Sequence, residues 1–164
     1  MSVMNKMRIH CLLFLVCLLG VVSPAVAGIP GAQAAILKGD FTRAFKEFKK
    51  EAEKGNPLAM APVAVMLHFG QGTKQDLKQA FAWYLKAAKK GYEAGMANVG
   101  IMYYKGAGTP QNDVKAYAWL DLASRARGGR EHNAKARVAG FLSAKQLKQA
   151  QQLALSLRKQ FHIK

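Results

Sequence analysis

The sequence repeats itself at an interval of 36 residues, and this periodicity constrains the fold more than any other feature. Residues 70–73, Gly-Gln-Gly-Thr, correspond to residues 106–109, Gly-Ala-Gly-Thr, and Trp83 and Trp119 share one register. A weaker half copy precedes them, and its members lie 36 positions before Asp76, Ala80, Phe81, Tyr84, Ala88 and Gly91: Asp40, Ala44, Phe45, Phe48, Ala52 and Gly55. Self-similarity at this period is typical of arrays of stacked structural units.

Within each unit the apolar residues have the spacing of a helix. From residue 76 to residue 90 they recur every three or four positions: Leu77, Ala80, Phe81, Tyr84, Ala87 and Ala88. Asp40 and Asp76 stand where an N-cap is needed, and Gly55 and Gly91 stand where a helix ends. Each unit is therefore expected to be a helix, a Gly-x-Gly turn, a second helix and a short link.

These residues resemble the Sel-one-like repeat family, a relative of the tetratricopeptide repeats. The first full copy follows the family pattern with Ala59, Val63, Ala64, Leu67, Gly70, Gly72, Asp76, Ala80, Trp83, Tyr84, Ala87, Ala88 and Gly91. The second copy follows it with Gly95, Val99, Gly100, Tyr103, Gly106, Gly108, Asn112, Ala116, Trp119, Leu120, Ala123 and Ser124. Ala64 and Leu67 depart from the usual glycine and tyrosine, and Arg127 replaces a final glycine. The resemblance implies an all-α fold, a right-handed α-α superhelix (solenoid) of helix-turn-helix repeats.

The rest of the chain is divided around this array. Residues 28–39 are predicted to be a short N-terminal lead, 40–55 the half copy, and about 56–91 and 92–127 the full copies. Residues 129–164 are predicted to fold as two capping helices, Glu131 to Leu142 and Ala144 to about Phe161, with a capping box at Ser143. Such caps are expected because a terminal unit has no neighbour to cover its apolar face.

The first 27 residues predict export. Lys6 and Arg8 precede an uncharged apolar stretch, residues 9–22, and Ala25-Val26-Ala27 has the small-x-small pattern of a cleavage site. The apolar stretch is shorter than the roughly 20 residues of a membrane-spanning helix. We therefore expect a signal peptide cleaved after Ala27 and a location in the bacterial periplasm.

Catalytic, cofactor and metal sites are not predicted. Cys11 and Cys17 lie in the predicted signal peptide, so the processed chain has no thiol for catalysis, metals or disulfides. The glycine pairs lack the further residues of a dinucleotide or phosphate loop. No His-Glu-x-x-His sequence or nucleophile elbow is present around the remaining histidines and serines: His68, His132, His162, Ser124, Ser143 and Ser156. Because Trp83 and Trp119 occupy identical positions, we predict that they pack between helices and form no ligand cage.

The resemblance implies that the first helix of each unit lines the concave side of the superhelix. The positions there that do not repeat as core form a candidate partner-binding groove: Met60, Val65, His68, Phe69, Met96, Asn98, Ile101, Tyr104 and Lys105. A surface that mixes methionine, aromatic and polar groups suits a peptide or a helix. The alternative is that several of these side chains pack against the flanking cap helices.

The charge of the chain favours anionic partners. Its formal net charge is +16, and such a field attracts anions without specifying a fold. Lys49, Lys50, Arg125 and Arg130, within the clusters 46–54 and 125–137, are candidates for a basic docking surface, and a merely solvated surface is the alternative.

The predicted function is that of an exported adaptor or scaffold that binds another envelope protein or peptide, with no specific nucleic-acid partner. Direct binding of an anionic polymer or membrane surface is the first alternative. The resemblance supplies a second, an enzyme that binds or hydrolyses β-lactams, but the relatives concerned are cysteine-rich and disulfide-bonded.

Overall fold

The computed structural model describes residues 29–127 and 131–163, and this part of the chain folds into helices joined by turns. The helices, in chain order, are α2 (Pro30–Leu37), α3 (Phe41–Glu53), α4 (Pro57–Phe69), α5 (Leu77–Lys89), α6 (Glu93–Lys105), α7 (Asp113–Arg127), α8 (Glu131–Ala139) and α9 (Ala144–Gln160). Because the described residues contain no strand, the prediction of an all-α fold is confirmed.

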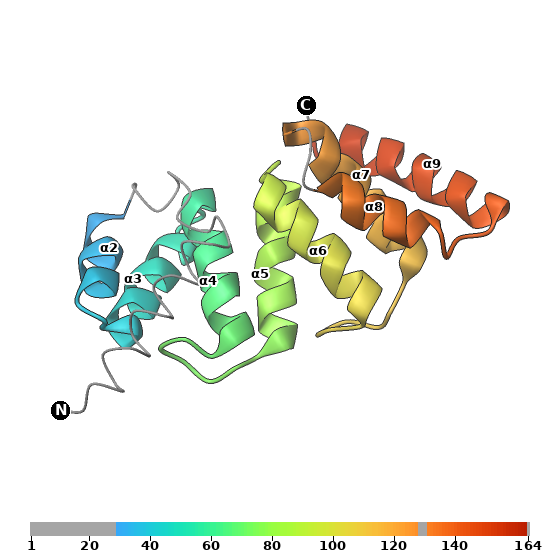
Figure 1. Ribbon diagram of the computed structural model, residues 1–164. Helices are drawn as coiled ribbons and strands as arrows, with labels where there is room; N and C mark the ends of the chain where they lie inside the picture. The colour runs from blue at the N-terminus through green and yellow to red at the C-terminus, as the bar shows by residue number, and fades with distance from the viewer. Residues whose placement is uncertain (1–28, 128–130, 164) are drawn as a thin grey trace.

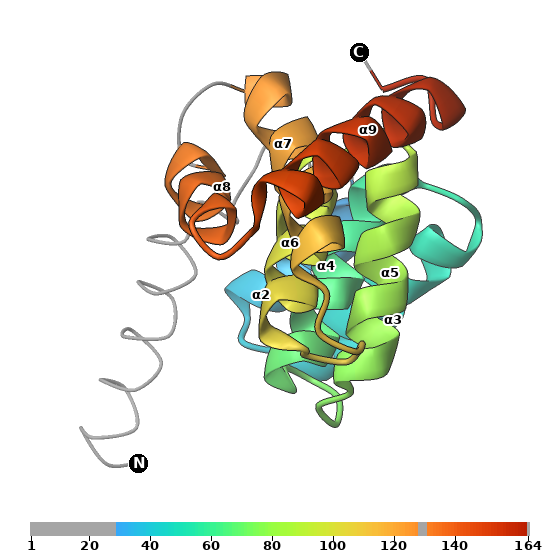
Figure 2. The same cartoon turned by 90° about the vertical axis from the view of Figure 1, so that its right-hand side faces the viewer.

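Successive helices pack against one another from α2 to α7 and form an elongated array (Figure 1). Viewed along the array, α2, α4 and α6 follow one another on one side, and α3 and α5 lie on the other (Figure 2). The first helices of the units therefore form one layer and the second helices form another. None of the described helices is long and apolar enough to cross a membrane.

The predicted N-terminal lead contains helix α2, which the sequence analysis missed. Its residues Ala32 and Ala35, together with Ile29, are buried, and the helix packs against α3. Because this segment consists largely of alanine and glycine, its large apolar residues do not recur at helical spacing, and the sequence pattern does not predict a helix. The half copy at Asp40 is consequently the second helix of a complete pair.

The helix ends follow the predicted capping chemistry. The Asp40 carboxylate accepts a hydrogen bond from the Arg43 amide and the Asp76 carboxylate accepts one from the Gln79 amide, each at 2.9 Å. Asn112 takes this role for α7, and Ser143 forms the predicted capping box with Gln146 at the start of α9. These side chains satisfy amides that have no acceptor within the helix.

The Gly-x-Gly turns fix how neighbouring units stack. Gly72 and Gly108 have φ angles of +68° and +70°, in the left-handed region that favours glycine. A Cβ atom on Gly72 would collide with the backbone carbonyl of Phe41, and one on Gly108 would collide with that of Leu77. The second glycine of each turn therefore rests on the first residue of the second helix in the preceding unit.

The core is built from positions that repeat along the array. Phe48, Tyr84 and Leu120 are spaced by 36 residues and are all fully buried. Burial also raises the pKa of the Tyr84 phenol. Trp119 is only 4% exposed, as its predicted packing role requires, whereas Trp83 is half-buried.

The last two helices both pack on α7. In Figure 2, α9 crosses the array and ends close to the end of α5. Phe161, the residue after α9, stacks on Trp119 with ring centroids 6.3 Å apart. The segment after α9 is thus folded back onto the repeats.

Candidate functional site

The outward surface of α4 and α6 contains most of the predicted groove residues, but two of them belong to the core. Met60 is 4% exposed and Met96 is 0% exposed. Each lies on the same helical stripe as the buried valine three residues later, Val63 or Val99. The predicted groove on this surface therefore does not include these two methionines, because both are buried in the main hydrophobic core.

The other seven groove residues are half-buried or exposed, and we call them the first-helix face: Val65, His68, Phe69, Asn98, Ile101, Tyr104 and Lys105. Six of them form pairs in the 36-residue register, with Val65, His68 and Phe69 on α4 matched by Ile101, Tyr104 and Lys105 on α6. Phe69 is 57% exposed, which is unusual for a large apolar side chain. The face therefore presents aromatic, aliphatic and cationic groups on two neighbouring helices.

His68 lies at the centre of the α4 part of this face. Its ring centroid is 4.7 Å from that of Phe69 and 6.4 Å from that of Tyr84. Its backbone carbonyl accepts a hydrogen bond of 2.7 Å from the side-chain Nε2 of Gln75. The Nδ1 atom is buried and has no hydrogen-bond partner among the described residues. Burial, and then the positive charge of Lys105, lower the pKa of His68. Both effects disfavour the charged form of the imidazole.

The α6 part of the face is bordered by the C-terminal helices. The rings of Tyr104 and Phe141 lie 6.1 Å apart, and Ile101 packs against the small cluster formed with α8 and α9. The amide nitrogen of Asn98 donates to the carbonyl of Ala94 at 2.8 Å, one turn earlier in the same helix. The predicted alternative, packing against cap helices, thus applies in part to Ile101 and Tyr104, which remain half-exposed.

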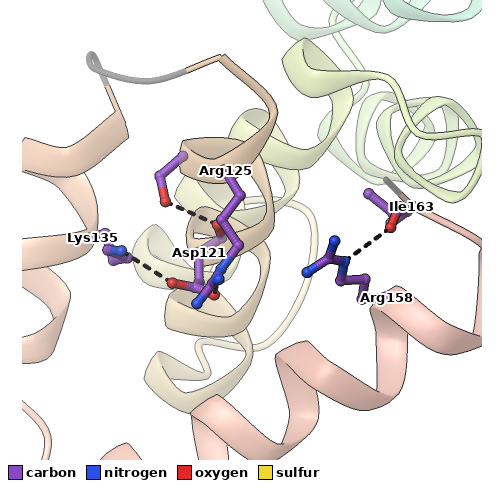
Figure 3. Close-up of polar contacts among 6 residues, drawn as sticks. Asp121, Arg125, Lys135, Arg158 and Ile163 are labelled. Atoms are coloured by element: carbon purple, nitrogen blue, oxygen red, sulfur yellow. Dashed lines mark hydrogen bonds and ion pairs between the residues drawn. The ribbon is translucent and has the colours of Figure 1, made fainter.

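The candidate basic residues differ in what they contact. Lys49 and Lys50 are exposed on α3, and Lys49 lies 3.9 Å from Glu53. Arg125 donates to the buried carboxylate of Asp121 at 2.8 Å, so its charge is already engaged within α7 (Figure 3). Arg130 lies outside the described residues.

Asp121 also joins two helices. Its second carboxylate oxygen accepts a hydrogen bond of 3.0 Å from Lys135 of α8 (Figure 3). Burial raises the pKa of Asp121, but the hydrogen bonds from Arg125 and Lys135 outweigh this effect and hold its pKa below the ordinary value. The Asp121 cluster therefore stabilises the junction of α7 and α8.

Comparison with known proteins identifies the repeats. The Sel1 repeat model matches residues 57–92 and 94–127, which cover the pairs α4–α5 and α6–α7. This chain carries two Sel1 repeats. The resemblance seen in the sequence is confirmed over these two units.

Solved structures show the same fold. The crystal structure of c5321, a protective antigen of uropathogenic Escherichia coli strains with an SLR fold, has a TM-score of 0.74 and 29% identity, over 84% of this chain and 30% of that chain. A Sel1 repeat protein from Oxalobacter formigenes has a TM-score of 0.52 and 30% identity, over 53% of this chain and 25% of that chain. The chain therefore spans less than a third of either structure. No curated protein sequence matches it.

The Sel1 register also identifies a residue that the sequence analysis missed. Phe141, in the turn between α8 and α9, is 64% exposed and borders Tyr104. It lies 36 residues after Lys105, which itself lies 36 residues after Phe69. Extending the period past the last Sel1 repeat would have added Phe141 to the first-helix face.

The described residues hold no group of three His, Cys, Asp or Glu side chains that could bind a metal ion. Sel1 repeats generally form interaction modules that are not catalytic. The first-helix face itself combines an imidazole, aromatic rings and the cation of Lys105.

Proposed function

We propose that this chain is an exported interaction module that binds a segment of another bacterial envelope protein on its first-helix face. The observation that carries this proposal is the pairing of Phe69 and Lys105, which are both exposed at equivalent positions of adjacent Sel1 units. An exposed ring on one unit and an exposed cation at the equivalent position of the next suit a segment that combines apolar and acidic residues. The net charge of +16 would speed the encounter with such a partner.

Affinity capture tests the docking surface. The processed chain is immobilised, exposed to envelope extract at low and at high salt, and compared with the double variant Phe69→Ser and Lys105→Glu. We expect the variant to lose its specific partner by about tenfold or more, because it removes apolar contact and reverses a charge. Leu155→Ser on α9 is the matched control, since Leu155 is also an exposed apolar residue. Equal capture by the double variant would remove the first-helix face from the proposed function.

Export is tested separately. The full chain is expressed in a bacterium, and the intact mass of the product is measured in periplasmic and cytoplasmic fractions. Signal-peptide cleavage after Ala27 predicts a periplasmic product that begins at Gly28. An unprocessed cytoplasmic product would contradict the proposed location. It would not affect the proposed docking surface, which the affinity capture tests.

Direct binding of an anionic envelope polymer remains the second candidate, favoured by the exposed Lys49 and Lys50 on α3. It predicts that cosedimentation with lipopolysaccharide or anionic vesicles survives the double variant and is lost with Lys49→Glu and Lys50→Glu. Arg125 is a poor probe of this idea because it is bonded to Asp121.

A further inference from the structure

A cleft with a volume of about 560 Å³ opens beside Trp83. It lies where α3 and α5 end and α4 begins, at the opposite end of α4 and α5 from their Gly-x-Gly turn. Its lining consists of Ala52, Glu53, Gly55, Met60, Trp83, Lys86, Lys89 and Lys90. Ala52 and Met60 are buried and Trp83 is half-buried, so the floor is apolar, and three lysines and one glutamate form the rim.

The equivalent place in the next Sel1 unit is already filled by the chain itself. There the ring of Phe161 stacks on Trp119, with centroids 6.3 Å apart and the ring planes 19° apart. The Nζ atom of Lys89 lies 5.5 Å from the Phe161 centroid, and Ile163 is buried in the same core cluster. The occupied site thus takes an aromatic side chain, with a cation beside its ring.

A helix-terminating turn delivers these side chains. His162 adopts a left-handed conformation with φ of +51°, and the Ile163 amide donates to the Arg158 carbonyl at 3.1 Å. The Arg158 side chain donates in turn to the Ile163 carbonyl at 3.2 Å (Figure 3). The His162 amide also donates to the Lys159 carbonyl, at 3.4 Å, and the two backbone bonds together form a Schellman motif, which folds the chain back at the end of a helix. The site next to Trp119 is therefore filled by a short polypeptide segment in a common backbone conformation.

The comparison of the two tryptophans indicates what the Trp83 cleft lacks. Trp119 is buried beneath Phe161, whereas over the ring of Trp83 lies the Nζ atom of Lys86, 4.0 Å from the centroid. The two sites share their position in the repeat, their tryptophan and a buried methionine, Met60 or Met96. They differ in that the described chain provides no aromatic side chain to stack on Trp83.

We propose that the Trp83 cleft is a second docking site, which binds an aromatic side chain of a partner polypeptide flanked by acidic residues. Charge complementarity selects the flanking residues, because Lys86, Lys89 and Lys90 surround the cleft. Glu53, the single acidic group of the rim, lies 3.9 Å from Lys49 and is partly neutralised. The site is independent of the first-helix face.

Peptide binding to the processed chain tests the site. The probe is a fluorescently labelled, end-blocked peptide in which Phe-x-Ile is flanked by aspartate and glutamate, and binding is measured by fluorescence anisotropy. Replacing the peptide phenylalanine by alanine should weaken binding at least about tenfold, through lost apolar burial. This change leaves the protein untouched and so raises no question of folding. Equal binding of the alanine peptide would overturn the proposal.

Protein variants locate the peptide. Lys90→Glu should weaken binding by about fivefold, and the matched control Lys78→Glu, exposed at the other end of α5, should change it less than about twofold. In a spectrum of the indole N–H groups, the signal of Trp83 should shift and that of Trp119 should not. Equal losses for the two lysine variants, or a shift confined to Trp119, would overturn the assignment.

Two further measurements distinguish binding at the Trp83 cleft from binding at the first-helix face and from binding of a second copy of this chain. The double variant of the first-helix face, Phe69→Ser and Lys105→Glu, should bind the peptide like the wild type, whatever it does in affinity capture. A basic peptide with the sequence of residues 157–163 should bind more weakly than the acidic peptide. Tighter binding of the basic peptide would overturn the acidic partner and indicate a second copy of this chain.

Discussion

Gly108 lies so close to the backbone carbonyl of Leu77 that no Cβ atom fits between them. The same relationship joins Gly72 to Phe41 one unit earlier. In each case a turn of one helical unit rests on the start of a helix in the unit before. These glycines are therefore required both for the stacking of neighbouring units and for the conformation of the turns.

Gly108→Ala should lower the free energy of unfolding by roughly 2–4 kcal/mol, because it adds a backbone clash to left-handed strain. Gly91→Ala is the matched control, since Gly91 has φ of +82° but no atom within 4 Å of an added Cβ. It should cost only about 1 kcal/mol. Urea denaturation followed by circular dichroism measures both values. If both variants lost the same free energy of unfolding, the strained turn conformation alone would explain the effect of Gly108→Ala, and the contact with Leu77 would not contribute.

Asp121 is predicted to stabilise the α7–α8 junction through its charge. Asp121→Asn should lower the free energy of unfolding by about 2 kcal/mol, because Arg125 and Lys135 both lose a charged acceptor. The folded-state pKa of Asp121 is depressed, so its contribution is present above the ordinary value near 4 and is lost as pH falls through the folded value.

Thermal unfolding measured from pH 7 to pH 3 tests this prediction. The difference between wild type and Asp121→Asn should be constant near neutrality and shrink below about pH 4. Glu53→Gln is a suitable control, because Glu53 is exposed and makes only a long contact of 3.9 Å with Lys49. A difference that grows in acid would contradict the assigned role.

His68 should make the fold less stable in mild acid. Its pKa is lowered in the folded protein, so below the ordinary value near 6.5 the unfolded chain binds the proton more readily. The free energy of unfolding should therefore fall as pH decreases from about 7, until His68 is protonated in the folded state as well. His68→Gln should show a flatter profile over this range, measured by urea denaturation. A His68 resonance that titrates at or above 6.5 would refute the expectation.

The repeat could be predicted because its determinants are local and periodic. Trp119, the glycine pairs and the caps such as Asp76 recur at fixed intervals, and each acts within or between adjacent units. Helix α2 was missed because alanine and glycine give no apolar stripe. Met60 and Met96 were misplaced because a helix with apolar residues around most of its circumference does not reveal which of them face the core.

The candidate site was less accessible to sequence reasoning for a different reason. The contact of Phe161 with Trp119 joins residues that are 42 positions apart, and no spacing rule predicts that the segment after α9 returns to the array. The same return distinguishes the two tryptophans, which are equivalent in sequence. The difference between the open cleft at Trp83 and the filled site at Trp119 therefore depends on a long-range contact that the repeat pattern does not contain.

The last prediction concerns this folded-back segment. Phe161→Ala should lower the free energy of unfolding by roughly 1–3 kcal/mol, because it removes a stacked, half-buried ring from Trp119. It should also shift tryptophan fluorescence to longer wavelength, since Trp119 gains access to water. Phe141→Ala is the control, as Phe141 is largely exposed and should change stability by less than about 0.5 kcal/mol. If Phe161→Ala left both stability and emission unchanged, Phe161 would not fill the site, and the comparison that defines the Trp83 cleft would lose its basis.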